Sequence, residues 1–448
     1  MSLSSLARSR DPKAPGLRPG VRLLRAAAHP RTQSGGFSNT FVPVAISILL
    51  AIAGGRPAAG GEWRQFRGTD NTSVSDETGL PKTFDVPSRH NIAWMAELPG
   101  RGPSSPIVVA GRALVTAADG AAQDRLHVLC FDSASGKLRW HRQLWATGST
   151  IVNPFGGVAT PTPASDGQRI FALFSSGDLA CFDLDGNLQW YRALGYESPT
   201  ARNDVGMGSS PLVVGRTVVV QLQNQGESFV AGLDATTGET RWRTERDHDV
   251  VWSSPTVLRG KTPDRDCVLL QGRGRLAAHD PRTGEKLWDY EAWVDTISSV
   301  TTCGREIYLP AVGLRALRCA EDGRSVKPLW YQQPLRVDNP SPVAGDGRVY
   351  FIKPPSILVC CSAADGRVAW QLRLKGPIWA TPVLADGHVY AVSYDGLVQV
   401  VTAGEEGKLV GVSRTDSAGS EILASPAVAG RALYFRSNTH LWKVAAPR

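Results

Sequence analysis

The sequence predicts an all-β protein, an eight-bladed β-propeller with four-stranded antiparallel blades. Three observations lead to this prediction. One pattern, a Ser-Pro or Thr-Pro step followed by hydrophobic strands and then by Asp, Gly and Trp, is repeated along the 448 residues. The spacing of its eight copies is roughly 40–52 residues, which is typical of propeller blades. Each copy has about four short strands and no helical period, as expected for a blade that packs around an axis.

The tryptophans at the ends of the copies mark the blades. The two best-preserved copies cover residues 209–242 and 253–288. The marker residues are Trp94, Trp140, Trp190, Trp242, Trp288, Trp330 and Trp370, and we expect Val410 at the place of the next one.

The recurring residues have structural roles. The turn from Asp280 to Gly284 combines an Asp side chain that caps its own turn with a Gly that can adopt a positive φ. The Trp that follows is large and flat, and we expect it to fill the wedge between adjacent blades. The Pro of each Ser-Pro step suits the start of a strand, where no N–H is needed. Repetition alone therefore indicates stability and not chemistry.

Residues 1–60 are predicted to be a targeting leader. They carry eight Lys or Arg and one acid, Asp11, and the apolar run 41–53 is followed by small residues. This order is typical of an export signal, and the run is shorter than the roughly 20 residues that span a bilayer. We expect a periplasmic or otherwise exported protein that is cleaved between about Gly54 and Gly61. A retained leader that anchors the chain in the membrane is the alternative.

The rest of the chain is almost neutral. Of the formal charge of +8, the leader accounts for +7, so the body carries +1. A neutral body gives no electrostatic footprint for nucleic acid, and we exclude that class of partner.

The remaining chain divides into a polar lead-in, residues 61–93, and a propeller, residues 94–448. The last repeat has strands at 425–429, 432–436 and 440–444 and then ends without a fourth. The strand around 91–98 has no blade of its own. We therefore expect this N-terminal strand to complete the last blade and close the ring, which removes exposed sheet edges. We expect a monomer.

Seven cysteines lie in the body. Cys130 and Cys181 occupy the same position in neighbouring repeats, where sheet packing places them about 10 Å apart, too far for a disulfide. We interpret the cysteines as small buried hydrophobic residues.

The Asp-x-x-Thr-Gly-x-x-x-Trp signature after a Ser-Pro strand resembles the tryptophan-docking repeat of the pyrroloquinoline-quinone-like propeller family. The resemblance covers about residues 90–448, and Trp63–Gly68 looks like the start of exported planctomycete-type members. It implies eight blades and one of two functions. One branch contains quinone-dependent alcohol and sugar dehydrogenases. The other contains non-catalytic scaffolds, such as the propeller of the outer-membrane β-barrel assembly machinery. The repeat does not separate the two branches.

No catalytic, haem or phosphate-binding motif is present in the sequence. Asp183-x-Asp185-Gly186 looks like part of a calcium loop, but it is the turn of the second repeat, and we expect no metal site. Cys360-Cys361 is similar to the vicinal disulfide of quinone alcohol dehydrogenases. It lies in an ordinary strand, so we interpret it as structural.

The axial loops, which lead into the innermost strand of each blade, carry the candidate ligand site. They share one face of a propeller and hold aromatic, charged and amide side chains that suit a pocket. The alternative is that Trp252 and Trp379 plug the axial channel while the charged residues are solvated. The candidate residues are Arg202, Asn203, Asp204, His248, Trp252, Asp295, Arg336, Asp338, Asn339 and Trp379.

Two functions follow. The first is an exported, non-catalytic propeller that serves as a binding platform for a protein or glycan, without a cofactor. The alternative is a dehydrogenase that binds pyrroloquinoline quinone with calcium and uses Asp338 or Asp295 as the base. Minimal blade lengths and the lack of haem motifs favour the platform, so we expect no enzyme activity.

Overall fold

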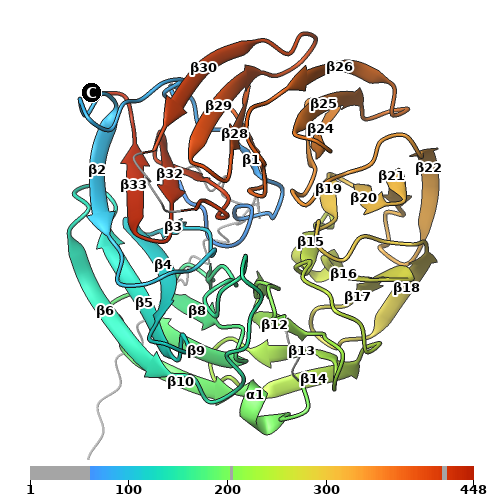
Figure 1. Ribbon diagram of the computed structural model, residues 1–448. Helices are drawn as coiled ribbons and strands as arrows, with labels where there is room; N and C mark the ends of the chain where they lie inside the picture. The colour runs from blue at the N-terminus through green and yellow to red at the C-terminus, as the bar shows by residue number, and fades with distance from the viewer. Residues whose placement is uncertain (1–60, 202–204, 416–420, 448) are drawn as a thin grey trace, which may run out of the picture. The chain divides into compact units, whose positions relative to one another are not determined.

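The computed structural model describes residues 61–201, 205–415 and 421–447. They belong to the compact unit Pro57–Arg448, and the leader lies outside the described residues. In this described part the strands form eight sheets arranged around an axis (Figure 1). Seven sheets have four strands, and the eighth has a fifth strand added at its inner edge. The predicted eight-bladed propeller is confirmed.

Four blades come from the first half of the chain. Blade 1 consists of β3 (Ile107–Val109), β4 (Arg112–Asp119), β5 (Arg125–Asp132) and β6 (Leu138–Trp145), and blade 2 of β7 (Ala164–Ser165), β8 (Arg169–Leu173), β9 (Asp178–Asp183) and β10 (Leu188–Ala193). Blade 3 consists of β11 (Leu212–Val214), β12 (Thr217–Leu222), β13 (Phe229–Asp234) and β14 (Thr240–Glu245), and blade 4 of β15 (Thr256–Leu258), β16 (Cys267–Gly272), β17 (Arg275–His279) and β18 (Lys286–Glu291).

The second half of the chain forms the other four blades. Blade 5 consists of β19 (Thr301–Cys303), β20 (Glu306–Ala311), β21 (Gly313–Cys319) and β22 (Val326–Gln332), and blade 6 of β23 (Val343–Gly345), β24 (Arg348–Lys353), β25 (Ile357–Ser362) and β26 (Val368–Arg373). Blade 7 consists of β27 (Val383–Ala385), β28 (His388–Val392), β29 (Leu397–Thr402) and β30 (Leu409–Arg414), with β1 (Val74–Ser75) added, and blade 8 of β31 (Ala427–Ala429), β32 (Ala432–Arg436), β33 (His440–Val444) and β2 (Ile92–Glu97).

Two short helical turns interrupt the strands, α1 (Leu194–Glu197) and the 3₁₀ turn η1 (Pro263–Arg265). Among the described residues no helix is long and apolar enough to cross a bilayer.

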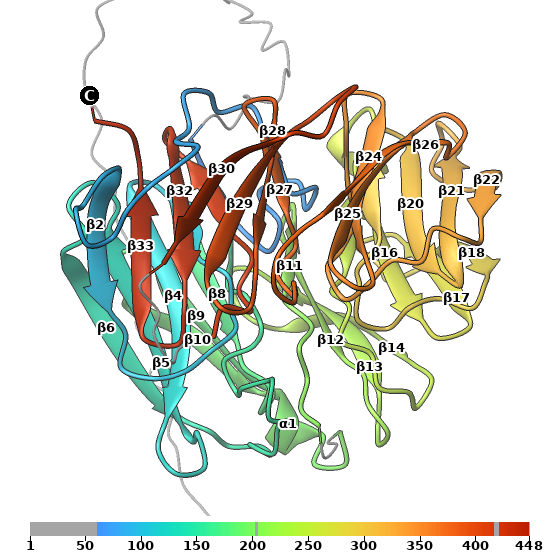
Figure 2. The ribbon, with the colours of Figure 1, turned by 45° about the horizontal axis from the view of Figure 1, so that its top comes forward.

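The ring closes as predicted. Strand β2 pairs antiparallel with β33, and Glu97 lies opposite His440 in the register. Strands β2 and β33, which come from near opposite ends of the described chain, thus share one blade, seen as the blue and red strands beside each other in Figures 1 and 2. Closure leaves the sheets of this ring without a break between the first blade and the last.

Each tryptophan docks on the turn of the next blade. The indole Nε1 of Trp242 donates a hydrogen bond to the backbone carbonyl of Pro281, at 2.9 Å. The ring covers the α-carbon of Gly284, where a Cβ would lie 2.6 Å from the indole. Gly284 also has a φ of +75°, so both the conformation and the close contact require glycine. A β-bulge one residue before the Trp aims it at the neighbouring blade.

The prediction that Val410 takes the place of a Trp is wrong by one residue. In blade 7 the bulged residue is Val410, and Gly411 pairs with Val400 as each Trp does in its own blade. The backbone of Lys82 occupies the space of the missing indole, since a Cβ on Gly411 would lie 2.0 Å from the Lys82 carbonyl oxygen. The physical reason is ring closure: the third and fourth strands of blade 8 come from opposite ends of the chain, so no turn connects them for a Trp to cover.

The lead-in fills this wedge between blades 7 and 8. The Phe84 ring stacks on Phe435 with ring centroids 5.7 Å apart, and the Phe84 N–H donates to the Ser413 hydroxyl at 2.8 Å. Residues of the lead-in thus take over a packing role that belongs to a Trp in the other blades.

A second part of the lead-in, residues 62–75, lies across the inner strands. Trp63 exchanges backbone hydrogen bonds with Val108 of β3, and Val74 pairs with Leu384 of β27. Between them, the buried Arg67 reaches Thr256 of β15 at 2.8 Å. This segment therefore connects blades on opposite sides of the ring.

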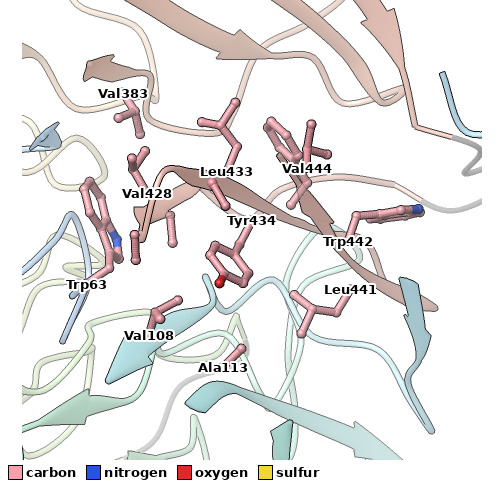
Figure 3. Packing of buried hydrophobic residues seen from close by; sticks show 14 of the residues in the cluster. Trp63, Val108, Ala113, Val383, Val428, Leu433, Tyr434, Leu441, Trp442 and Val444 are labelled. Atoms are coloured by element: carbon pink, nitrogen blue, oxygen red, sulfur yellow. The ribbon is translucent and has the colours of Figure 1, made fainter. Parts of the chain in front are cut away.

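The largest buried cluster joins the lead-in to blades 7, 8 and 1. Figure 3 shows Trp63 near Val108, Val383 and Val428, with Tyr434 toward the centre of the view. Residues that are far apart in the sequence meet here, so this core forms only when the ring closes.

All seven cysteines are free thiols. Six are buried, as interpreted from the sequence, whereas that interpretation is wrong for Cys303, which ends the three-residue strand β19 and is exposed. Cys360 and Cys361 lie in β25, the third strand from the axis, where burial raises the pKa of the Cys361 thiol to about 12. They pack as core residues and not at the axis.

Candidate functional site

A ring of hydroxyl groups surrounds the axis. Each blade contributes one Ser or Thr from the step that precedes its innermost strand, and the backbone N–H of each donates to the hydroxyl oxygen of the next blade. The bonds run from Ser105 N to Thr162 Oγ1 (2.9 Å), Thr162 N to Ser210 Oγ (3.0 Å), Ser210 N to Ser254 Oγ (2.9 Å), Ser254 N to Ser299 Oγ (3.0 Å), Ser299 N to Ser341 Oγ (3.0 Å), Ser341 N to Thr381 Oγ1 (3.1 Å), Thr381 N to Ser425 Oγ (2.9 Å) and Ser425 N to Ser105 Oγ (3.0 Å).

This hydroxyl ring stabilises the closed propeller and leaves hydrogen-bonding capacity unused. Each hydroxyl oxygen accepts one backbone bond, and its own proton has no acceptor among residues 61–201, 205–415 and 421–447. A Ser or Thr hydroxyl has one donor and two lone pairs, so one donor and one lone pair per residue remain. All eight side chains are at least nine-tenths buried.

The hydroxyl ring forms the lower wall of an axial pocket of about 340 Å³. The lead-in contacts the inner strands below the ring, on the side away from the axial loops, and Phe66 is its residue in the pocket lining. Phe66 therefore forms the floor. The axial loops supply apolar walls, including Met207, Trp252 and Trp379.

Aromatic side chains stand at the mouth of the axial pocket. Phe155 and Trp379 stack with centroids 5.6 Å apart and planes at 17°, and Tyr394 meets Phe155 edge-on at 6.4 Å. Trp252 is fixed by a hydrogen bond of 2.8 Å from its Nε1 to the carbonyl of Gly206. These contacts hold the aromatic wall in place.

The described lining of the axial pocket is uncharged. It contains no Asp, Glu, Lys, Arg or His among the described residues. Two arginines lie close behind it: Arg67 contacts Thr256, and Arg436 donates to the carbonyl of Ser104 at 2.9 Å. Neither has an acidic partner in the described chain, and burial lowers the pKa of Arg67 and of Arg436 to about 9.

A second cavity of about 320 Å³ lies beside the axial pocket. Both are lined by Ser175, Gly206 and Met207. The outer walls of the second cavity include Ile151 and Tyr196, both exposed. The site is therefore a pocket on the axis with a second cavity beside it, which is lined by the segments before and after blade 2 and by the turn between β8 and β9.

The structure brings three predicted site residues together. Trp252, Asn339 and Trp379 line the axial pocket. The lead-in with Phe66 lies across the channel below the hydroxyl ring, and Trp252 and Trp379, the tryptophans of the plug hypothesis, form the wall above it.

The other predicted site residues are not part of this lining. His248 and Arg336 are exposed, and no ion pair joins Arg336 to Asp338 in the described chain. The Asp295 carboxylate accepts hydrogen bonds from the N–H groups of two following residues, at 2.7 and 3.0 Å, so it caps its own turn. Asp338 accepts a bond of 3.0 Å from the N–H of Asn339. The remaining candidates Arg202, Asn203 and Asp204 lie outside the described residues.

The axial pocket does not fit a calcium-bound quinone. Calcium in proteins is held by several oxygen ligands, carboxylates above all, and the described part of this lining has no carboxylate. Among the described residues, no cluster of His, Cys, Asp or Glu has the arrangement of a metal site. The lining offers neutral hydroxyls, amides and aromatic faces instead.

The sequence analysis missed the hydroxyl ring and Phe66. The repeated Ser-Pro and Thr-Pro steps were visible, but only their prolines were given a role. Ring closure turns the same position of eight blades into one circle around the axis, and the repeated hydroxyl before each innermost strand was the signal. Phe66 has no repeated counterpart, so nothing in the pattern indicated its position.

Comparisons with known proteins place the chain among propellers. A family model described as outer membrane protein assembly factor BamB matches residues 87–226, 200–301 and 319–441. BamB of Burkholderia pseudomallei (strain K96243) is 27% identical over 352 residues, which are 75% of this chain and 81% of that protein.

Solved structures from two functional classes share the fold. BamB from Moraxella catarrhalis matches with a TM-score of 0.57 and 16% identity, over 78% of this chain and 96% of its own. A quinohaemoprotein alcohol dehydrogenase from Comamonas testosteroni matches with a TM-score of 0.62 and 13% identity, over 87% of this chain and 81% of its own. At these identities the likeness shows the fold alone.

Proposed function

The chain belongs to the propeller family described as outer membrane protein assembly factor BamB, and we propose that it is an exported, non-catalytic binding platform in outer-membrane protein assembly. Its partner in this proposal is a polypeptide. The family match covers most of the propeller, and the match to BamB of Burkholderia pseudomallei extends over three quarters of the chain.

The single observation that carries a polypeptide partner is an exposed apolar patch at the second cavity. Trp145, Ile151 and Tyr196, the docking patch of this proposal, are 60%, 56% and 73% exposed. Ile151 and Tyr196 line the same cavity, and Trp145 ends the strand that leads into its wall at Thr147. Exposed apolar residues that gather around a hollow are typical of protein interaction sites.

The rigid hydroxyl ring supports the role of the propeller as a binding platform. The hydroxyl ring fixes the axial loops of all blades to one another, and binding residues on loops work best when a rigid scaffold positions them. The docking patch combines the end of β6 and the segment after it with the helical turn α1 that follows blade 2, so its parts are held by two neighbouring blades.

The alternative, a quinone-dependent dehydrogenase, has less support. Asp295 and Asp338, its candidate bases, do not line the axial pocket, and the lining lacks the carboxylate ligands for calcium. A titration of the purified protein with pyrroloquinoline quinone and calcium, read by absorbance, tests this directly. Micromolar binding that is lost in Asp338→Asn would favour the dehydrogenase.

Site-directed photo-crosslinking in the native cells tests the platform. A photoreactive amino acid at Tyr196 or Ile151 should give a discrete adduct with a component of the outer-membrane assembly machinery. The matched control is Val368, an exposed apolar residue on the outer strand of blade 6. Adducts of equal yield and identity at both places would contradict the docking patch.

A charge substitution adds a second readout. Tyr196→Asp should weaken capture of the crosslinked partner by at least about tenfold, since it places a charge in an apolar contact. Val368→Asp should leave capture unchanged.

Export remains a proposal that rests on the leader. The basic, apolar and small-residue order of residues 1–60 supports cleavage between about Gly54 and Gly61. The intact mass of the protein from the cell envelope checks this. A mature form that retains Arg8 to Arg31 would contradict it.

A further inference from the structure

We propose that the axial pocket binds the terminal ring of a neutral saccharide, an all-equatorial pyranose that lies flat across the axis. This goes beyond the polypeptide platform and does not depend on it, because the docking patch and the axial pocket use different side chains. Three properties of the pocket carry the inference: its encircling hydroxyls, its apolar floor and aromatic walls, and its neutrality.

The hydroxyl ring matches the rim of such a sugar. Each of its hydroxyls has one proton and one lone pair left after the backbone bond, so it can both donate and accept. Sugar hydroxyls have the same double capacity. In an all-equatorial pyranose they point outward around the rim, toward a surrounding wall of partners. The protons of these buried hydroxyls have no acceptor in the described chain, and an unsatisfied buried donor is costly, which favours an occupant that accepts from them.

The floor and the upper walls match the two faces of the sugar. The faces of an all-equatorial pyranose expose C–H groups, and such apolar faces pack on aromatic rings. Phe66 offers a ring at the floor, while Trp252 and Trp379 offer rings in the wall above. Both indoles are already fixed, Trp252 by its bond to Gly206 and Trp379 by stacking on Phe155, so binding does not have to order them.

The described lining has no charged side chain, which favours a neutral ligand over an anion. Arg67 and Arg436 lie behind the hydroxyl ring, but neither lines the pocket. One nitrogen of the Arg67 guanidinium, Nη2, donates to Thr256 and to the carbonyl of Val300, at 2.8 Å each, while Nε and Nη1 have no partner in the described chain. Because neither guanidinium is part of the pocket lining, an anion in the pocket would lose its hydration without gaining a direct ion pair. The volume of about 340 Å³ lies within the range for small-ligand sites, about 300–1,000 Å³.

Ligand-observed NMR and calorimetry on the purified full chain test the proposal with three probes. They are methyl β-glucoside, with all hydroxyls equatorial, methyl β-galactoside, with one axial hydroxyl, and glucuronate, which adds a carboxylate. We expect saturable binding of the glucoside that is at least about tenfold tighter than that of the other two. No saturation by the glucoside up to about 10 mM would overturn the proposal. Tighter binding of glucuronate would overturn it in favour of an anion site.

Two pairs of variants place the sugar in the pocket. Trp379→Ala should weaken glucoside binding at least about tenfold, whereas Trp293→Ala, an exposed tryptophan outside the pocket, should leave it unchanged. Thr162→Val removes one hydroxyl of the ring at almost constant side-chain shape and should weaken glucoside binding about tenfold. Thr162→Ser keeps the hydroxyl and should bind the glucoside as tightly as the unmodified chain.

The results for these variants show whether the sugar binds in the axial pocket. Equal losses in Trp379→Ala and Trp293→Ala would overturn the assignment to this pocket. Thermal melts accompany the Thr162 pair, and if Thr162→Val does not fold, the tryptophan pair and the sugar preference of the unmodified chain still decide.

Discussion

At the scale of single residues, the contact between a Trp and the turn of the next blade is the repeated link between blades. Trp242 is almost fully buried, with its Nε1 bonded to the carbonyl of Pro281 and its ring on the α-carbon of Gly284. The contact combines a satisfied polar group with a large apolar area, which explains why a Trp recurs at this position.

Trp242→Ala should lower the free energy of unfolding by about 3–5 kcal/mol, because it leaves a cavity between blades 3 and 4. Lys261→Ala, a change at an exposed ion pair with Glu321, should stay within about 0.5 kcal/mol. Urea denaturation of both variants is the measurement. Equal midpoints would remove the wedge role of Trp242.

Gly284→Ala should be strongly destabilising in the native chain and less so in Trp242→Ala. The added Cβ would lie 2.6 Å from the indole of Trp242, and this clash vanishes when the ring is removed. Only the strain of a positive φ then remains. A double-mutant cycle should give a coupling of about 1–3 kcal/mol. Additive effects would show that ring and turn do not interact.

At the scale of elements, the turn between the third and fourth strands depends on an ionised aspartate. A hydrogen bond from Arg139, together with bonds from Ser135, holds the pKa of Asp132 well below its usual range. Burial works against ionisation of Asp234, but bonds from Arg241 and from the turn outweigh it and lower its pKa to about 2. The corresponding turns of blades 1 and 3 thus both depend on an ionised aspartate.

Stability should therefore fall in acid. A carboxyl with a lowered folded pKa contributes stability that is complete above the unfolded pKa, near 4, and is lost as the pH falls toward the folded value. We expect the urea midpoint to drop between about pH 4 and pH 2. Asp234→Asn should reduce this dependence. The control Glu291→Gln removes an exposed acid with no partner in the described chain and should not change it. A flat profile in the native chain would contradict the role of the turns.

At the scale of the whole molecule, closure depends on segments that come before the first blade. Strand β2 completes blade 8, residues 80–84 fill the wedge that lacks a Trp, and residues 62–75 cross below the hydroxyl ring. The ring is thus held by its own N-terminal segment at three places.

Deletion of residues 91–98 should open the ring and expose the edge of β33. Open sheet edges pair with other chains, so the variant should aggregate. Sedimentation and light scattering measure this. A deletion variant that stays monomeric and unfolds in one cooperative transition would contradict closure by β2.

The sequence by itself determined the blades, because the interactions that define a blade are local and repeated. The Asp–Gly turn, the Pro before the strand and the Trp that follows the Gly act within one repeat or between neighbours, so their spacing was enough to predict the fold. The same reasoning predicted closure by the strand at 91–98, since the last repeat lacked a strand. The residue that replaces the Trp in blade 7 could also have been predicted. Gly411 follows Gly407 at the same spacing that separates the turn Gly from the Trp in most of the other copies, and this position is one residue beyond Val410.

Only the tertiary structure decided what the axis contains. The hydroxyls of Ser105 and Thr381 come from distant repeats and face a common pocket only after the ring has closed. The lead-in carries no repeated pattern, and its course is set by the spaces that the closed ring leaves, one below the hydroxyl ring and one in the wedge that lacks a Trp. Charged residues such as Arg336 looked functional in the sequence, yet desolvation is costly for a charge, and Arg336 stays in solvent while neutral side chains line the pocket.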